Sequence, residues 1–354
     1  MAQPKIFIFT PNEQDDPSHD VLTEAGCRLE MGESDWFTPH VLNDEDRFWA
    51  NSHDANALTG VMIRACPISR KVLGQAPDLR IIAKYTIGVD DVDVDAATEM
   101  GIMVTHCPTE SNWGGVAEGT MAMMLGILKK TRQRDRQVKD GLWREPHLAG
   151  TYLGRRQDGY EGITVGVVGL GRIGSRLSDL LAPWRVRLLA CDPYVDLSKF
   201  VHHNAEKVDL DTLLRESDVV TMHTNLTDET RDMITAEKLA LMKPNAVLIN
   251  TSRGPVVNQE ALFDALDKDV IAGAAIDVFP MEPPEPQSPL LGLGDKILLS
   301  PHMVSSSFPG GLRPGVDWAT RSLITALKGG VPDNVYNKEV IPDWLARFEG
   351  SNLL

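Results

Sequence analysis

Short apolar runs alternate with amphipathic stretches through the middle of the chain. Stretches such as Leu210–Arg215 and Gln259–Leu266 have a helical spacing of apolar residues. Buried strands separated by helices are typical of repeated βαβ units, so the pattern predicts a parallel sheet covered by helices. Because the crossovers of such units are right-handed, the strands should all end at one edge of the sheet. The predicted strands are Ile163–Val168, Val186–Cys191, Asp218–His223, Ala246–Asn250, Ile271–Val278 and Ile297–Ser300.

The N-terminal part of the chain has its own alternation of strand and helix patterns. Apolar runs predict strands at Ile6–Phe9, Leu58–Ile63, Leu79–Ala83 and Ile102–Thr105, and Asp93–Glu99 predicts a helix between two of them. A chain of 354 residues is also too long for one ordinary core. We therefore predict an α/β protein with two doubly wound parallel-sheet domains of the Rossmann or flavodoxin type.

A glycine-rich segment follows the first strand of the middle region. It reads Gly169-Leu170-Gly171-Arg172-Ile173-Gly174 and continues into a helical pattern. In a chain with 29 glycines the bare pattern is weak evidence, but a strand before it and a helix after it indicate a dinucleotide site. Gly169 allows a tight turn, Gly171 lets the backbone approach a pyrophosphate, and Gly174 allows close helix packing. The amides of Arg172 and Ile173, which open the helix, should face the phosphates.

The second strand of this region ends at Asp192, eighteen residues after Gly174. An acidic residue at this place accepts hydrogen bonds from the adenosine ribose and repels a 2′-phosphate. The following Pro193-Tyr194 supplies no arginine for such a phosphate. The sequence therefore predicts NAD as the cofactor in preference to NADP.

Three residues near later strand ends form a candidate catalytic set. Arg253 can hold a carboxylate through its planar guanidinium, His302 can exchange a proton near neutral pH, and Glu282 can orient that imidazole. Each has an ordinary alternative: a surface arginine, a structural histidine and a glutamate in a proline-rich loop. Their positions at consecutive strand ends favour a shared active site.

These segments together resemble the D-isomer-specific 2-hydroxyacid dehydrogenase family over roughly residues 60 to 330. The steps of 29 residues from Arg253 to Glu282 and of five from Asp277 to Glu282 fit the family pattern. The matching segments are Gly169–Gly174, Asp192, Thr251-Ser252-Arg253-Gly254, Asp277-Val278-Phe279 with Glu282, and Ser300-Pro301-His302.

The resemblance implies a role for each matching residue. Arg253 would bind the carboxylate of a 2-keto acid, and His302, paired with Glu282, would be the acid/base. Thr224, Thr251 and Asp277 fall where the family contacts NAD. The segment from Arg80 to Asp90 matches a family loop whose backbone amides bind the substrate carboxylate, which indicates Ile87 and Gly88.

The resemblance also implies the domain organisation. Residues 1–108 and 305–354 would form the substrate domain, and residues 109–304 an inserted NAD-binding Rossmann domain. The helical stretch Val116–Leu128 could be ordinary core, but its family counterpart lies at a two-fold interface. We therefore expect a homodimer.

Some segments depart from the family pattern. Asn225 stands where the family usually has proline, and His106-Cys107-Pro108 replaces a more usual Asn-x-Pro. Trp113 could be hinge packing or could face the substrate. The segment Arg144–Glu161, which includes His147, is irregular and could be a solvated loop or could reach an anionic substrate. These departures leave the identity of the 2-hydroxy acid open.

Composition narrows the classes of partner. The net charge of −15, from 35 basic and 50 acidic residues, disfavours nucleic acid and anionic membranes. The chain has no apolar run long enough to span a membrane, and its beginning has a strand pattern, not that of a signal peptide. The four cysteines are scattered, without the spacing of a metal site. We therefore expect a reduced, cytoplasmic protein without a structural metal.

Two other functions remain open at this point. Relatives that act as transcriptional corepressors keep much of this site, so an NAD-sensing regulatory protein would carry the same residues. Other relatives oxidise formate or phosphite on the same scaffold. Turnover of 2-keto acids with NADH separates these possibilities.

Overall fold

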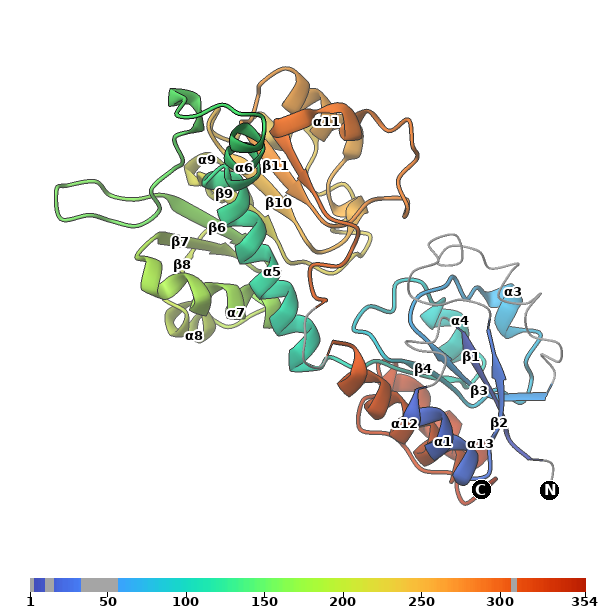
Figure 1. The fold of residues 1–354 in the computed structure, drawn as a ribbon. Helices are drawn as coiled ribbons and strands as arrows, with labels where there is room; N and C mark the ends of the chain where they lie inside the picture. The colour runs from blue at the N-terminus through green and yellow to red at the C-terminus, as the bar shows by residue number, and fades with distance from the viewer. Residues whose placement is uncertain (1–2, 10–15, 33–56, 307–310) are drawn as a thin grey trace. The chain divides into compact units, whose positions relative to one another are not determined.

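The computed structural model describes residues 3–9, 16–32, 57–306 and 311–354. The chain forms two compact units, which we call unit 1 (Met1–Asn112 with Ser307–Leu354) and unit 2 (Trp113–Ser306) (Figure 1). Unit 2 is therefore an insertion in the sequence of unit 1. The assignment of one unit to the substrate and the other to the cofactor stays a prediction.

Unit 1 contains a five-stranded sheet in the order β2-β1-β3-β4-β5, and all neighbouring strands are parallel. This is the strand order of flavodoxin-like folds. The strands are β1 (Lys5–Phe9), β2 (Arg28–Met31), β3 (Leu58–Ile63), β4 (Ile81–Lys84) and β5 (Met103–Thr105). The helices are α1 (Pro17–Glu24), α3 (Arg70–Leu73), α4 (Val94–Glu99), α12 (Arg313–Leu327), η8 (Lys338–Val340) and α13 (Ile341–Phe348).

Helices cover both faces of this sheet. Alternate residues of β1 point to opposite sides, so that Phe7 and Phe9 belong to one apolar cluster while Ile6 and Ile8 belong to another. The first cluster includes residues of α3 and α4, and the second includes residues of α1, α12 and α13. The C-terminal helices thus complete the core of the N-terminal sheet.

Unit 2 contains a seven-stranded parallel sheet in the order β12-β11-β10-β9-β6-β7-β8. The strands are β6 (Thr164–Val168), β7 (Arg187–Cys191), β8 (Glu206–Lys207), β9 (Val219–Met222), β10 (Val247–Asn250), β11 (Gly273–Ile276) and β12 (Ile297–Leu299). The helices are α5 (Glu110–Leu128, which begins before the unit boundary), α6 (Thr131–Lys139), η3 (Pro146–Leu148), α7 (Arg172–Leu181), η4 (Ala182–Trp184), α8 (Leu197–His202), α9 (Leu210–Glu216), α10 (Ala236–Leu239), η5 (Gly254–Val256), α11 (Gln259–Asp267), η6 (Pro289–Gly292) and η7 (Gly294–Lys296).

The second sheet is also buried on both faces. Val219 packs in a cluster with residues of α5 and α7, whereas its neighbour Val220 packs with residues of α9, α10 and α11. Near-continuous apolar strands are expected when helices cover both faces of a parallel sheet. The predicted α/β fold with two parallel sheets is confirmed.

The strand order of unit 2 places a switch point beside β6. Its neighbours are β7 and β9: the chain runs outward from β6 through β7 and β8, then crosses to the other side of β6 and continues through β9, β10, β11 and β12. Ligands of open α/β sheets bind beyond the carboxyl ends of the strands at such a point. The candidate site residues of unit 2 lie just after the carboxyl ends of these strands.

Candidate active site

The chain turns sharply after β6, where Val168 is followed by the glycine loop. Gly169 has a φ of 92°, a backbone conformation that residues other than glycine rarely adopt. A Cβ atom at Gly169 would lie 2.7 Å from the His223 carbonyl oxygen, and one at Gly174 would lie 2.1 Å from the Gly169 carbonyl oxygen. Both glycines are therefore required by the close packing of the protein itself.

Gly171 has a different environment. A Cβ atom there would meet no other part of the described chain within 4 Å, and its φ of −73° is accessible to any residue. Packing within the protein therefore gives no reason for glycine at this position. Gly171 immediately precedes α7, where unpaired helix N–H groups attract phosphate. The open space and the amides of Arg172 and Ile173 fit the pyrophosphate of a dinucleotide.

Asp192 follows β7 and lies against the glycine loop. Its Oδ2 accepts a hydrogen bond of 2.8 Å from the Leu170 N–H, and its Oδ1 accepts one of 2.9 Å from the Tyr194 N–H. These contacts hold the carboxylate beside the strand end where the adenosine ribose of a dinucleotide is bound.

The loop after β9 holds two buried polar groups beside Gly169. Burial lowers the pKa of His223 to about 3, so this imidazole is neutral at physiological pH. Within the described part of the chain, His223 Nδ1 and Thr224 Oγ1 are buried without a hydrogen-bond partner. Buried polar atoms are normally paired, so an unpaired hydroxyl next to the glycine loop suits a bound ligand.

The turn after β10 positions Arg253. The buried Asn250 side chain accepts hydrogen bonds from the N–H and hydroxyl of Ser252 and donates one of 2.9 Å to the Arg253 carbonyl oxygen. Arg253 in turn donates from Nη1 to the Ser252 carbonyl oxygen at 2.8 Å. Asn250 was not among the predicted site residues, because an asparagine at a strand end carries no signal of its own.

Gly254 brings this turn against the loop that carries Glu282. A Cβ atom at Gly254 would lie 2.0 Å from the Phe279 carbonyl carbon, a contact that no side chain could make. The Phe279 N–H donates to Glu282 Oε1 at 3.0 Å. The backbone contact at Gly254 therefore places the Arg253 turn beside the segment that orients Glu282.

Glu282 and His302 form a direct pair. His302 Nδ1 lies 2.7 Å from Glu282 Oε2, and the two side chains are 42% and 26% exposed. Burial is the largest influence on the pKa of Glu282 and raises it. The hydrogen bond and charge of His302, the Phe279 N–H and the charge of Arg253 outweigh burial and hold this pKa below its ordinary value. The three predicted catalytic residues thus lie within one electrostatic cluster.

Asp277 holds the backbone that carries His302. His302 has a φ of 54°, which costs a residue other than glycine about 1 kcal/mol. The Asp277 carbonyl oxygen accepts from the His302 N–H at 2.7 Å, and its buried carboxylate accepts from the N–H groups of Met303 and Val304. Hydrogen bonds to a charged group contribute about 1.5–3 kcal/mol each, enough to offset the strained conformation.

Other predicted residues have different surroundings. The buried Thr251 hydroxyl lies 2.8 Å from the Thr120 hydroxyl of α5. Ile87 and Gly88 follow β4 in unit 1, and the structure does not place that unit relative to unit 2. Their predicted contact with the substrate stays a prediction.

The structure also describes the residues that depart from the family pattern. Trp113 is half-buried in α5, and Asn225 accepts a hydrogen bond from the Thr230 hydroxyl through its carbonyl oxygen. His147 is exposed in η3, and its carbonyl oxygen accepts from Lys130 Nζ. In the segment after η3, the guanidinium of Arg156 lies over the rings of the exposed Tyr152 and the partly buried Tyr160.

Among the described residues, no group of three or more histidine, cysteine or acidic side chains could hold a metal ion. None of the helices in the described ranges is long and apolar enough to cross a lipid bilayer.

The switch point and the glycine loop define a dinucleotide-binding protein of the α/β class. Residues 121–304 match the family model of the D-isomer specific 2-hydroxyacid dehydrogenase, NAD binding domain. The chain belongs to this family, and NAD is its cofactor. The predicted family and cofactor are confirmed.

Individual relatives cover most of the chain. It is 37% identical to a glyoxylate reductase of Thermofilum pendens over 96% of both chains. It is 35% identical to a D-3-phosphoglycerate dehydrogenase of Archaeoglobus fulgidus over 76% of this chain and 49% of that one. The apo-structure of D-lactate dehydrogenase from Escherichia coli matches with a TM-score of 0.74 and 26% identity, covering 94% of this chain and 99% of that one.

The contrast between Gly171 and Gly174 generates a paired prediction. Gly171→Ala should leave the melting temperature nearly unchanged but raise the dissociation constant for NADH about tenfold or more, because the methyl group enters the space for the pyrophosphate. Gly174→Ala should lower the free energy of unfolding by about 1–3 kcal/mol, because its methyl group meets backbone. Calorimetric unfolding and NADH fluorescence titration measure both effects. Equal NADH affinity in wild type and Gly171→Ala would contradict the assignment of this space.

Proposed function

We propose that this protein is an NAD-dependent oxidoreductase that interconverts a 2-keto acid and a D-2-hydroxy acid. The observation that supports it most is the contact between His302 and Glu282, 2.7 Å apart, within the electrostatic reach of Arg253. A proton donor beside a fixed cation suits a substrate that carries a carbonyl next to a carboxylate.

The contact with Glu282 determines which imidazole nitrogen reacts. A carboxylate only accepts hydrogen bonds, so Nδ1 of His302 carries the proton of this pair. Nε2 is then the atom that exchanges a proton with substrate. Glu282, ionised because its pKa is lowered, fixes the ring orientation and stabilises the imidazolium.

Reduction and oxidation use opposite forms of His302. In reduction, Arg253 holds the carboxylate of the keto acid, and the imidazolium donates its Nε2 proton to the carbonyl oxygen as that oxygen becomes an alcohol. NADH, held at the Gly169–Gly174 loop, would supply the hydride that C2 receives. In oxidation, neutral His302 accepts the hydroxyl proton through Nε2.

The substrate we propose is a small 2-keto acid, with glyoxylate as the first candidate. The support is the 37% identity to a protein named glyoxylate reductase, over 96% of both chains. The match to D-3-phosphoglycerate dehydrogenase covers only about half of that relative. An NAD-sensing regulatory role, or oxidation of formate or phosphite, is the alternative outcome of the experiment below.

The deciding experiment is a panel of keto acids assayed with NADH at saturating concentration. Glyoxylate, hydroxypyruvate, pyruvate and branched or aromatic 2-keto acids should include at least one good substrate. His302→Ala should then lower kcat by about 10² to 10⁴ with NADH affinity little changed. Tight NADH binding without turnover of any member would support the sensing role if formate and phosphite also fail to reduce NAD, and oxidation of either one would support that activity instead. A near-normal kcat in His302→Ala would remove this residue from the mechanism.

The His302–Glu282 contact predicts a shift of both pH profiles. Glu282→Gln nearly preserves shape but removes the negative charge that stabilises the protonated ring of His302. The descending limb of reduction and the ascending limb of oxidation should therefore both move toward acid. At neutral pH reduction should be impaired more than oxidation.

Profiles of kcat/KM against pH in both directions, for wild type and Glu282→Gln, measure this shift. Because the pKa of Glu282 is below its ordinary value, its own titration does not produce a limb near neutrality. Superimposable profiles in the two proteins would mean that Glu282 does not act through His302.

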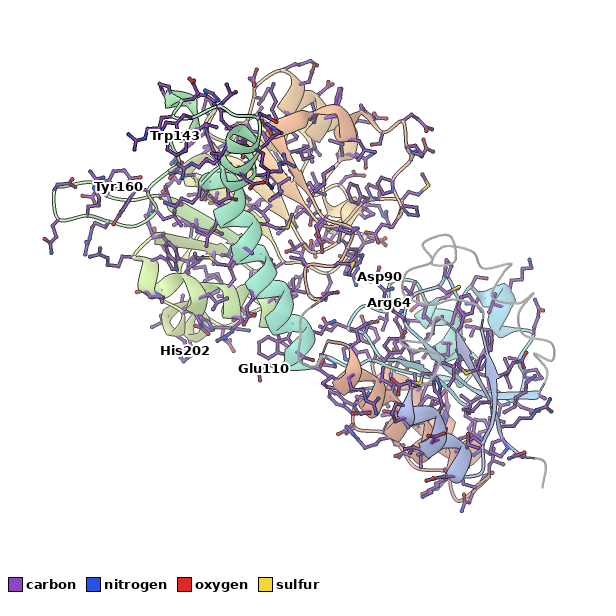
Figure 2. The ribbon with its side chains drawn as sticks, viewed as in Figure 1. Arg64, Asp90, Glu110, Trp143, Tyr160 and His202 are labelled. Atoms are coloured by element: carbon purple, nitrogen blue, oxygen red, sulfur yellow. The ribbon has the colours of Figure 1, made fainter. Side chains whose placement is uncertain are left out.

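We further propose a cytoplasmic homodimer. None of the four cysteines, all of which lie in the described residues, forms a disulfide, as expected for a reducing compartment. The helix expected at the interface, α5, is largely covered within its own unit. By contrast α6 buries none of its residues, and Val138, Leu142 and Trp143 in or just after it are more than half exposed. Trp143 is labelled in Figure 2. Neighbouring exposed apolar side chains often mark a protein interface.

A single charge in this exposed segment tests the dimer. Trp143→Glu should convert a dimer into a monomer, as measured by light scattering after size exclusion, because it places a charge in an apolar interface. Val201→Glu is the matched control, since Val201 is an equally exposed apolar residue on α8. A dimer that persists in Trp143→Glu would exclude this segment from the interface.

A further inference from the structure

His106 follows β5 in unit 1 and contacts the loop that follows β4. Its Nδ1 lies 3.0 Å from the Ile87 carbonyl oxygen. A carbonyl oxygen only accepts hydrogen bonds, so the imidazole must carry its proton on Nδ1 and donate it. The side chain therefore fixes the direction in which the Ile87 carbonyl group points.

The same contact fixes the direction of the Gly88 N–H. The Ile87 carbonyl and the Gly88 N–H belong to one planar peptide group, and in a trans peptide they point in opposite directions. None of the backbone hydrogen bonds among the described residues uses the Gly88 N–H. The imidazole holds this peptide group by its carbonyl oxygen, so the Gly88 N–H points away from the imidazole.

His106 is itself held firmly by the C-terminal part of unit 1. Its N–H donates to the Asn334 carbonyl oxygen at 3.2 Å, and the buried Asn334 side chain donates to the His106 carbonyl oxygen at 2.9 Å. Ser322 of α12 fixes that amide through a hydrogen bond of 2.8 Å. The Tyr336 ring meets the imidazole edge-on, with centroids 5.3 Å apart.

The adjacent peptide of the loop is anchored in parallel. The Cys107 N–H donates to the Thr86 carbonyl oxygen at 2.8 Å. Backbone contacts therefore hold Thr86, whereas a side chain holds Ile87. A substitution at His106 can release the Ile87–Gly88 peptide without detaching the loop.

We propose that His106 is a positioning residue that aims the Gly88 N–H at the carboxylate of the 2-keto acid. The inference rests on the proposed function and on the prediction that the amides of Ile87 and Gly88 bind that carboxylate. His106 stands where the family more usually has the asparagine of Asn-x-Pro, and this role would explain how the histidine contributes to substrate binding. His106 does not touch the reacting atoms and takes no part in proton transfer.

The test separates loss of the hydrogen bond from loss of the ring. His106→Phe keeps an aromatic ring against Tyr336 but cannot donate to the Ile87 carbonyl oxygen. It should raise KM for the best 2-keto acid about tenfold, leave kcat within about twofold, and leave NADH affinity unchanged. His106→Gln, which restores a donor, should recover part of the loss. His202→Phe, the same change at an exposed histidine of unit 2, should have no effect.

A binding measurement without turnover completes the test. Calorimetric titration of the NADH complex with oxamate, a carboxylate that mimics a keto acid, should show a weaker affinity in His106→Phe, while the melting temperatures of both proteins agree within about 2 °C. If wild type reduces keto acids and His106→Phe has an unchanged KM and oxamate affinity, the positioning role is wrong. A fall in kcat alone would also overturn it. If wild type reduces no keto acid, the proposed function fails and the inference with it.

Discussion

The buried carboxylate of Asp277 is the constraint on which the arrangement of the site depends. It accepts hydrogen bonds from the N–H groups of Met303 and Val304, while the Asp277 carbonyl oxygen accepts from His302. These bonds hold His302 in a left-handed backbone conformation that would otherwise be unfavourable. The imidazole can meet Glu282 only because this turn is fixed. A residue that we expected to contact the cofactor therefore also supports the candidate acid/base.

Glycines set the other distances of the site by allowing backbone to meet backbone. Side chains at Gly174 or Gly254 would overlap carbonyl groups, whereas a side chain at Gly171 would enter open space. Gly174 and Gly254 let elements of the protein pack closely, whereas Gly171 leaves open space that fits a pyrophosphate. Glycine therefore serves close packing at some positions of this sheet edge and ligand space at another. Only the surrounding atoms show which of the two applies at a given glycine.

The sequence was sufficient to predict the strands that lie inside the sheets, because burial on both faces leaves an apolar run. The edge strands β2 and β8 were not predicted. β2 has no fully buried side chain, and β8 consists of the exposed Glu206 and Lys207, so neither carries the apolar signature. The residues Arg253, Glu282 and His302 were identified because their chemistry is conspicuous. Asn250 and the contacts of Asp277 and His106 were missed, since they depend on turns whose partners are distant in sequence.

The insertion of unit 2 within unit 1 has a consequence for synthesis of the chain. Strands β1, β3 and β4 leave the ribosome early, but the α12 and α13 residues that cover one face of their sheet follow only after residue 311. Until then Ile6, Ile8 and Met62 have no apolar cover from these helices, a state prone to aggregation. Unit 2 is continuous in sequence and does not have to wait in this way. The N-terminal sheet is begun first and completed last, so a nascent chain that stalls within unit 2 would be a natural client for chaperones.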